Sequence, residues 1–219
     1  MAGRLAGDCV NRWSGFRHPV VTAIIAATAV VALTGCGAAG ASGDDGERAA
    51  AEESSLPPGV MPPNDPPQPG DARLGPDGHY DYSAPDFVLK NPCDTEYFQR
   101  AMELGWQVPE IGTKRRDEPD SATCSIVNDS TGLPLVNFKN SATELEKQGY
   151  SAETHTIGGI SFVMLRGNAL FGESCFAGVE TELGFIGAMS GTGGFSQFTN
   201  LDDACNEAQV TIIPILGEN

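Results

Sequence analysis

Four cysteines in the C-terminal part of the chain constrain its fold more than any other feature. Cys9 and Cys36 lie near the N-terminus, and the others follow at wide spacings: Cys93, Cys124, Cys175 and Cys205. An even number of cysteines in a small domain of an oxidising compartment indicates disulfide bonds. Three pairings are possible. We favour Cys93–Cys124 and Cys175–Cys205, because each would join a predicted helix to a predicted strand.

The N-terminal segment predicts export and lipid attachment. A basic stretch with three arginines precedes an apolar run over 19–33, which is long enough for a signal-peptide core and short for a membrane span. The run closes on Leu33-Thr34-Gly35-Cys36, the pattern of a bacterial lipobox. Its cysteine thiol would receive a diacylglyceryl group before cleavage makes it the first residue. We therefore expect a signal peptide over 1–35 and acyl chains such as palmitate on Cys36, anchoring the protein at the extracytoplasmic face of the cell membrane. The alternatives are an ordinary secretory signal and an uncleaved span.

The composition changes near residue 85. From residue 36 to 84 the chain is rich in Ala, Gly, Ser, Asp and Glu and then in proline, and it has few large apolar residues. Such a segment offers little apolar surface to offset its ordering entropy. We predict a disordered, lipid-anchored tether over 36–84 and a folded extracytoplasmic domain over 85–219.

The charge of the chain limits its partners. The precursor has 13 basic and 29 acidic residues, and residues 1–35 contain three arginines and Asp8, so the mature chain has 10 basic and 28 acidic residues and a net charge of −18. This charge argues against nucleic-acid binding. It is explained by solubility in the envelope, or alternatively by a cationic partner or a divalent ion.

Helix signals occur near both ends of the predicted domain. Asp94 can cap a helix that ends before Gly105, and Ser141 with Glu144 forms a capping box for a short helix that stops at Gly149. A closing helix is predicted over 201–213, although its β-branched end would suit a strand equally well.

Strand signals fill the region between these helices. We predict strands over 123–128, 133–139, 152–156, 160–165 and 174–182, with 183–189 continuing the last strand or beginning another. Turns are expected at Gly158-Gly159, at Gly167-Asn168 and in the glycine-rich segment 190–194. The order predicts an α+β domain, with an antiparallel sheet, helices near both ends and two disulfides.

The ordered set of motifs resembles a known family. Asn91-Pro92-Cys93 opens the domain, Gly158-Gly159 precedes a strand, and Asp202-Asp203-Ala204-Cys205 leads the closing helix. With Cys124, Cys175 and the lipobox, this set is similar to actinobacterial cell-envelope lipoproteins that carry a small cysteine-paired domain of unknown function. The resemblance implies a cell-surface lipoprotein, and it implies no activity or catalytic residues.

The candidate catalytic groups are few. His79 falls in the predicted tether, and His155 is expected at an ordinary strand position. Glu180 and Glu182 share one face of a predicted strand, which we interpret as a solvated sheet face rather than an acid–base pair. A four-thiolate zinc site lacks the usual Cys-x-x-Cys pair. We therefore predict no catalytic residue, cofactor or metal.

Two loops are the most plausible contact surface of the domain. One contains the basic residues Lys114, Arg115 and Arg116, and the other contains Ser190, Gly191 and Gly193. The sequence favours a non-enzymatic envelope lipoprotein that binds an envelope protein or a wall or lipid ligand. The alternatives are a small hydrolase or transferase with a carboxylate site, and a carrier of lipids or other hydrophobic molecules.

Overall fold

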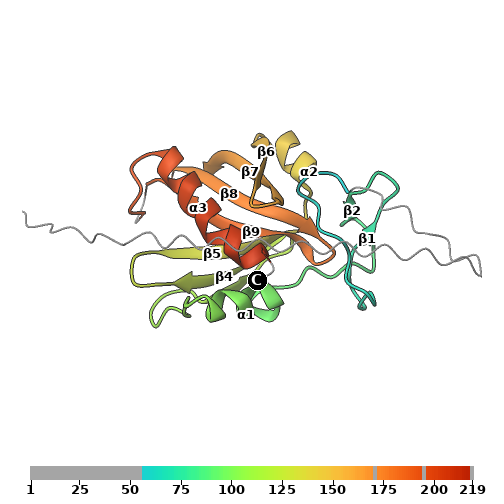
Figure 1. The fold of residues 1–219 in the computed structure, drawn as a ribbon, viewed down its shortest axis with the longest axis horizontal. Helices are drawn as coiled ribbons and strands as arrows, with labels where there is room; N and C mark the ends of the chain where they lie inside the picture. Colours follow the sequence, from blue (N-terminus) through green and yellow to red (C-terminus); the bar gives the residue numbers. More distant parts are fainter. Residues whose placement is uncertain (1–55, 170–171, 194–195, 218–219) are drawn as a thin grey trace, which may run out of the picture. The chain divides into compact units, whose positions relative to one another are not determined.

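A seven-stranded antiparallel sheet organises the protein (Figure 1). The computed structural model describes residues 56–169, 172–193 and 196–217. The signal peptide, the lipidation site Cys36 and the first part of the predicted tether lie outside these residues. Within the described ranges, no helix combines the length and the apolar character that crossing a membrane requires.

The sheet has the strand order β3-β4-β5-β9-β8-β7-β6. Its strands are β3 (Arg115–Asp117), β4 (Ser121–Val127), β5 (Gly132–Phe138), β6 (Ser151–Ile157), β7 (Ile160–Ala169), β8 (Gly172–Thr181) and β9 (Gly184–Gly191). The other elements are the two-residue strands β1 (Arg73–Leu74) and β2 (Tyr80–Asp81), the 3₁₀-helix η1 (Pro92–Asp94), and the helices α1 (Glu96–Glu103), α2 (Ala142–Lys147) and α3 (Leu201–Leu216). This arrangement confirms the predicted α+β class with an antiparallel sheet.

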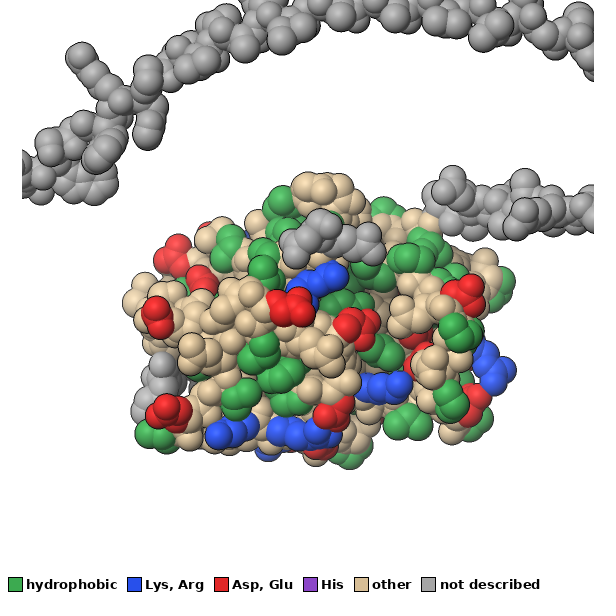
Figure 2. Space-filling model, turned by 60° about the horizontal axis from the view of Figure 1, so that its bottom comes forward, with side chains coloured by type: hydrophobic (Ala, Val, Ile, Leu, Met, Phe, Trp, Pro, Cys, Tyr) green, Lys and Arg blue, Asp and Glu red, His purple; other side chains and the backbone are tan. Residues whose placement is uncertain are grey.

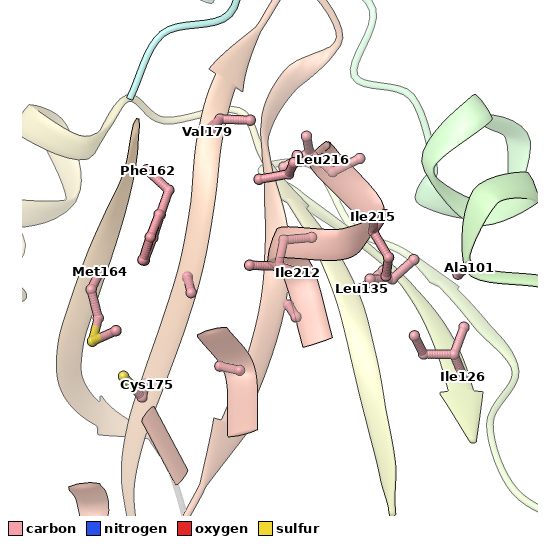
Figure 3. Close-up of a cluster of buried hydrophobic side chains, with 14 of the residues drawn as sticks. Ala101, Ile126, Leu135, Phe162, Met164, Cys175, Val179, Ile212, Ile215 and Leu216 are labelled. Carbon is pink, nitrogen blue, oxygen red and sulfur yellow. The ribbon is translucent and has the colours of Figure 1, made fainter. Parts of the chain in front are cut away.

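Helices α1 and α3 cover one face of the sheet. Ile212, Ile215 and Leu216 of α3 are buried against side chains of the strands, and Ala101 of α1 lies beside Ile126 and Leu135 (Figure 3). Asn200 caps α3 by accepting a hydrogen bond from the Asp203 backbone N–H at 2.9 Å. The β-branched end of the predicted closing helix is helical, because Thr211 and Ile212 are buried in the core and tertiary packing outweighs strand propensity.

Both predicted disulfides are present. Cys93 of η1 is bonded to Cys124 of β4, and Cys175 of β8 is bonded to Cys205 of α3. Each bond therefore joins a helical element to a strand, as the sequence predicted. The second bond attaches α3 to the centre of the sheet.

The boundary of the folded domain lies earlier than predicted. Residues 56–84, which we call the N-terminal strap, pack on the second face of the sheet, near the end of β8. Backbone hydrogen bonds fix the strap at Glu180 and Glu182, whose carbonyls accept from the N–H groups of Met61 at 2.9 Å and Ala72 at 2.7 Å. The prediction of a disordered tether extending to residue 84 is therefore wrong for residues 56–84. Contact with a preformed sheet compensates for their low content of large apolar residues.

The strap also changes the environment of two glutamates. Glu180 and Glu182 were predicted on a solvated face, but they are 2% and 5% exposed. The Glu180 side chain points to the second face, where it contacts His79 of the strap and Ala142 of α2. Glu182 directly follows β8 and lies next to Asp71 and Ala72 of the strap. The expectation of a solvated face was wrong because the covering layer has no long helix or strand pattern in the sequence.

Two predicted turns have different outcomes. Gly158 and Gly159 form the tight turn between β6 and β7, with φ values of 61° and 86° that suit a type I′ hairpin. Gly167 and Asn168 instead lie inside β7 and pair with Ser174 and Glu173 of β8. The capping box of Ser141 and Glu144 is present at the start of α2.

Candidate ligand-binding site

The sheet opens between its central strands β5 and β9. These strands pair from Phe138↔Phe185 to Leu135↔Ala188, and the pairing stops at Pro134. In β4, Ser125 is paired with Pro134. The Ser125 backbone N–H points away from β5, toward β3, and donates to the Lys114 carbonyl at 2.9 Å. The alternation of an antiparallel ladder therefore directs the nitrogen of residue 134 toward β9. Proline has no N–H to donate there, so the ladder ends and the two strands diverge.

The loops around this opening are held by short-range hydrogen bonds. The Asn128 side chain accepts from the N–H groups of Ser130 and Thr131, both at 2.9 Å, and turns the chain from β4 into β5. The Thr192 N–H donates to the Glu173 carbonyl at 2.8 Å, which joins the end of β9 to the start of β8. Gly172 makes this approach possible, because a Cβ there would lie 2.0 Å from the Thr192 carbonyl oxygen.

A pocket of about 390 Å³ occupies the opening. Its apolar walls come from Leu133, Pro134, Met189 and Phe198, and its polar groups come from Thr131, Glu173, Ser174, Ser190, Thr192, Ser196 and Gln197. The structure thus places all three residues of the second predicted contact loop, Ser190, Gly191 and Gly193, in the lining of one pocket. Ser190 and Gly191 belong to strand β9 rather than to a turn.

Ser190 is the most distinctive polar group of the pocket. Its side chain is buried, and its Oγ makes no hydrogen bond with any described residue. A buried hydroxyl without a partner costs free energy, so it favours a ligand that can donate to it or accept from it. By contrast, the amide of Gln197 is engaged, since its Nε2 donates to Thr131 Oγ1 at 2.9 Å.

The described lining residues carry no Lys, Arg or His. Glu173 is the one ionisable side chain among them, and it is exposed at the rim. The pocket therefore lacks the cationic groups that compensate a phosphate or a carboxylate. Its chemistry suits a neutral molecule with an apolar part and a few hydrogen-bonding groups.

The predicted basic contact loop lies elsewhere. Arg115 and Arg116 belong to the edge strand β3, which β4 and β5 separate from β9. Arg115 pairs with Asp94 at 2.8 Å and with Asp117 at 2.9 Å, and Arg116 pairs with Glu118 at 2.8 Å. The structure therefore does not bring the two predicted loops into one site.

Ion pairing weakens the basic cluster as an anion site. Hydrogen bonds from Arg115 and Asn91 hold the pKa of Asp117 below its ordinary value. On the face shown in Figure 2, Lys and Arg side chains lie next to Asp and Glu rather than in one continuous basic patch. Most of the positive charge of Arg115 and Arg116 is thus compensated within the chain.

A second polar cluster lies beneath the strap. His79 Nδ1 is 3.0 Å from Glu180 Oε2, and Glu180 Oε1 accepts from the Ala142 N–H at 3.3 Å. Burial, and then the negative charges of Asp71 and Glu96, raise the pKa of the Glu182 carboxyl. Burial also raises the pKa of Tyr82, whose hydroxyl donates to the Thr181 carbonyl at 3.0 Å.

The carboxylates on and near β8 and α3 do not converge on one site. Glu173 lies near the start of β8, whereas Glu180 lies near its end and Glu182 directly follows it, both in contact with the strap. Asp203 lies in the first turn of α3 and is exposed. Among the described residues, no group of three His, Cys, Asp or Glu side chains has an arrangement that could hold a metal ion.

The sequence contained signals for two features that were missed. Pro134 lies inside a predicted strand, and a proline in a central strand marks a place where the ladder is interrupted. His79 was assigned to the tether, but the alternation Tyr80-Asp81-Tyr82 directly after it predicts a short strand with buried tyrosines. Comparison of the chain with family models, curated proteins and solved structures gave no significant match.

Proposed function

We propose that this protein is a lipid-anchored lipoprotein of the cell envelope whose folded domain acts by binding. The lipobox at Cys36 supports the anchor, and the two disulfides are typical of an oxidising, extracytoplasmic compartment. The membrane would be its partner through the acyl chains. The second partner would be a molecule held in the pocket between β5 and β9.

The observation that carries this proposal is a pocket with apolar walls whose lining includes Ser190, a residue with a buried and unpartnered hydroxyl. A volume of about 390 Å³ lies in the range of small-molecule sites. Because the described lining has no cationic group and the mature chain has a net charge of −18, an anionic ligand is disfavoured. We infer a neutral ligand with an apolar part, such as a portion of a wall sugar or of a neutral lipid headgroup.

Binding is tested by NMR titration of the protein with two neutral probes, N-acetylglucosamine and octyl glucoside. A probe that occupies the pocket should shift signals of Ser190, Gly191 and Phe198. Ser190→Ala should weaken that binding about tenfold, which corresponds to about 1.4 kcal/mol. Ser151→Ala, a matched change at an exposed serine of β6, should leave binding unchanged.

The outcomes separate the possibilities. If neither probe shifts pocket signals, the proposed ligand class is wrong. If a probe binds with equal affinity to the wild type and to Ser190→Ala, the hydroxyl does not contribute and the ligand lies in another place.

The anchor is tested separately by intact mass. The native protein should lack residues 1–35 and carry a diacylglyceryl group on Cys36. Cys36→Ala should abolish the added mass and release the protein from the membrane. A Cys36→Ala protein that stays firmly in the membrane would support an uncleaved span instead.

One observation favours the enzymatic alternative. Glu180 holds the half-exposed His79 ring through Nδ1, as a carboxylate does for an imidazole in many acid–base sites. Among the described residues, no serine, threonine or cysteine side chain is hydrogen-bonded to His79, so a nucleophile is lacking. Turnover of wall polymer that is lost in His79→Gln would replace the binding proposal with a hydrolase.

The carrier alternative receives less support. Such a protein would need an apolar cavity between the sheet and its covering helix. Side chains fill this region in the structure, where Ile212 and Leu216 of α3 lie opposite strand residues such as Val179 (Figure 3).

A further inference from the structure

The two edges of the seven-stranded sheet differ in their protection. Edge strand β3 has three residues, all charged, and their side chains form ion pairs. Edge strand β6 has seven residues, Ser151–Ile157, whose side chains are mostly exposed. It contains no Lys, Arg or Pro, the residues that commonly block pairing at an edge. Only β6 therefore offers a long strand that can accept another strand.

The hairpin fixes which backbone groups of β6 face outward. The two-residue turn Gly158-Gly159 closes on the pair Ile157↔Ile160, which is hydrogen-bonded in this type of hairpin. The ladder then alternates, so the N–H and C=O groups of Ala152, Thr154 and Thr156 point away from β7. No other described strand or loop forms backbone hydrogen bonds with these residues.

We propose that β6 pairs antiparallel with β6 of a second copy of this chain, about a two-fold axis at Thr154. Thr154 would then exchange both backbone hydrogen bonds with Thr154 of the partner subunit. Ala152 would do the same with Thr156 of the partner subunit, and Thr156 with the partner subunit's Ala152. The two sheets would join into one continuous sheet, a common form of association at free edges.

Side-chain chemistry selects this register. With the axis at Thr154, Glu153 lies directly opposite His155 of the partner subunit, on the same face of the sheet. His155 Nε2 is buried, has no hydrogen-bond partner among the described residues and lies 3.5 Å from Glu153 of its own strand. The pairing thus places a carboxylate of the other copy opposite each imidazole ring, as in a cross-strand pair of complementary charge.

The neighbouring symmetric registers are less favourable. Moving the axis to Glu153 would place two glutamates opposite each other, and like charges at opposite positions destabilise a sheet. Moving it to His155 would place the two imidazoles opposite each other and leave both glutamates without a cross-strand partner of opposite charge. Only the axis at Thr154 pairs the glutamate with the histidine twice.

Cysteine cross-linking of the full-length chain in membranes tests the contact directly. Opposed residues of a hydrogen-bonded antiparallel pair have Cα atoms about 5.5 Å apart, within the range of a disulfide. Thr154→Cys should therefore form a disulfide-linked dimer under mild oxidation. Thr156→Cys carries an equally exposed thiol one ladder step away, opposite Ala152 of the partner subunit, and should not form a dimer.

Three results would overturn the proposal. These are no dimer with Thr154→Cys, equal dimer formation by both variants, and cross-linking of Thr154→Cys only to a different protein. The last result would show that the edge pairs with another partner.

A charge variant tests the same contact without forming a covalent bond. Thr154→Lys would place two like charges across the axis, so the detergent-solubilised full-length protein should change from dimer to monomer mass in light scattering. Thr143→Lys introduces the same charge at an exposed position of α2 and should keep the dimer mass. A wild-type protein of monomer mass at every concentration would contradict the proposal, whatever the variants do.

Discussion

Helix α3 and the N-terminal strap bury opposite faces of one sheet by different means. Helix α3 has 16 residues and places apolar side chains such as Ile212 and Ile215 against the strands. The strap has only two-residue strands, and it contributes the buried side chains of Val60, Ala72, Tyr80 and Tyr82. Regular secondary structure is therefore not required for a segment to become part of the core.

The strap is positioned through the backbone of the sheet. Strands β7 and β8 pair only as far as Val163↔Gly178, and beyond that point Val60 forms a parallel bridge with Glu180. The Glu180 N–H donates to the Gly59 carbonyl at 2.8 Å. The strap thus takes the place of β7 beside the end of β8, and a few apolar side chains are then sufficient to cover the face.

The largest effect is expected when the strap is removed. A chain that begins at residue 85 would expose the apolar side chains on the second face and leave Glu180 without His79. Burial of each large side chain contributes about 1.5–3 kcal/mol, so the loss should exceed about 4 kcal/mol in free energy of unfolding. Urea unfolding followed by the fluorescence of Trp106 measures this loss.

A chain that begins at residue 56 is the control, and it should unfold at the same urea concentration as the mature protein. If the chains starting at 56 and at 85 were equally stable, the strap would be a tether after all.

The next effect concerns α3. Ile212→Ala should lower the free energy of unfolding by about 2–5 kcal/mol, because the side chain is fully buried and its removal leaves a cavity. Val210→Ala on the exposed side of the same helix should change it by less than about 0.5 kcal/mol. Equal effects of the two substitutions in urea unfolding would show that α3 does not form this cover.

A smaller effect is expected from one hydrogen bond of the strap. Tyr82→Phe removes the bond to the buried Thr181 carbonyl and should cost about 1 kcal/mol. Tyr150→Phe is a suitable control, because the Tyr150 hydroxyl forms no hydrogen bond with a described residue, and thermal unfolding should show almost no change. A Tyr82→Phe protein as stable as the wild type would mean that the strap is held by its backbone and apolar contacts alone.

The smallest effect is a pH dependence caused by the strap. Burial raises the pKa of Glu182 above its ordinary value of 4.5, so the folded protein holds a proton that the unfolded chain has already released. The contribution of the Glu182 carboxyl to the free energy of unfolding is fully present below pH 4.5 and is lost as the pH rises through the raised pKa. Glu182→Gln cannot lose a proton and should lack this component.

The measurement is the difference in free energy of unfolding between the wild type and Glu182→Gln across this pH range. The wild type should weaken relative to the variant as the pH rises. A constant difference would show that Glu182 is solvated and that the strap does not cover it.

Much of the fold could be predicted from local patterns. Strands β4 and β5 and the capping box at Ser141 were identified from residues close in sequence, and the two disulfides from the even number of cysteines and from the helix and strand that each would join. Ser190, Gly191 and Gly193 were predicted as a contact loop, and the pocket itself, an opening in the sheet, was not predicted. The signal for the opening was Pro134, and its meaning depends on which strand lies next to β5.

The sequence by itself determined the periodic elements, because alternation, capping residues and glycine turns act between near neighbours in the chain. It could not determine that residues 56–84 belong to the core, because they are poor in large apolar residues and only the short alternation at Tyr80-Asp81-Tyr82 favours an ordered state. Only the tertiary structure decided this, since the unpaired end of β8 offers the strap hydrogen-bond partners and an apolar surface. The burial of Glu180 and Glu182, and the pairing of Glu180 with His79 from 101 positions earlier, follow from the same contact.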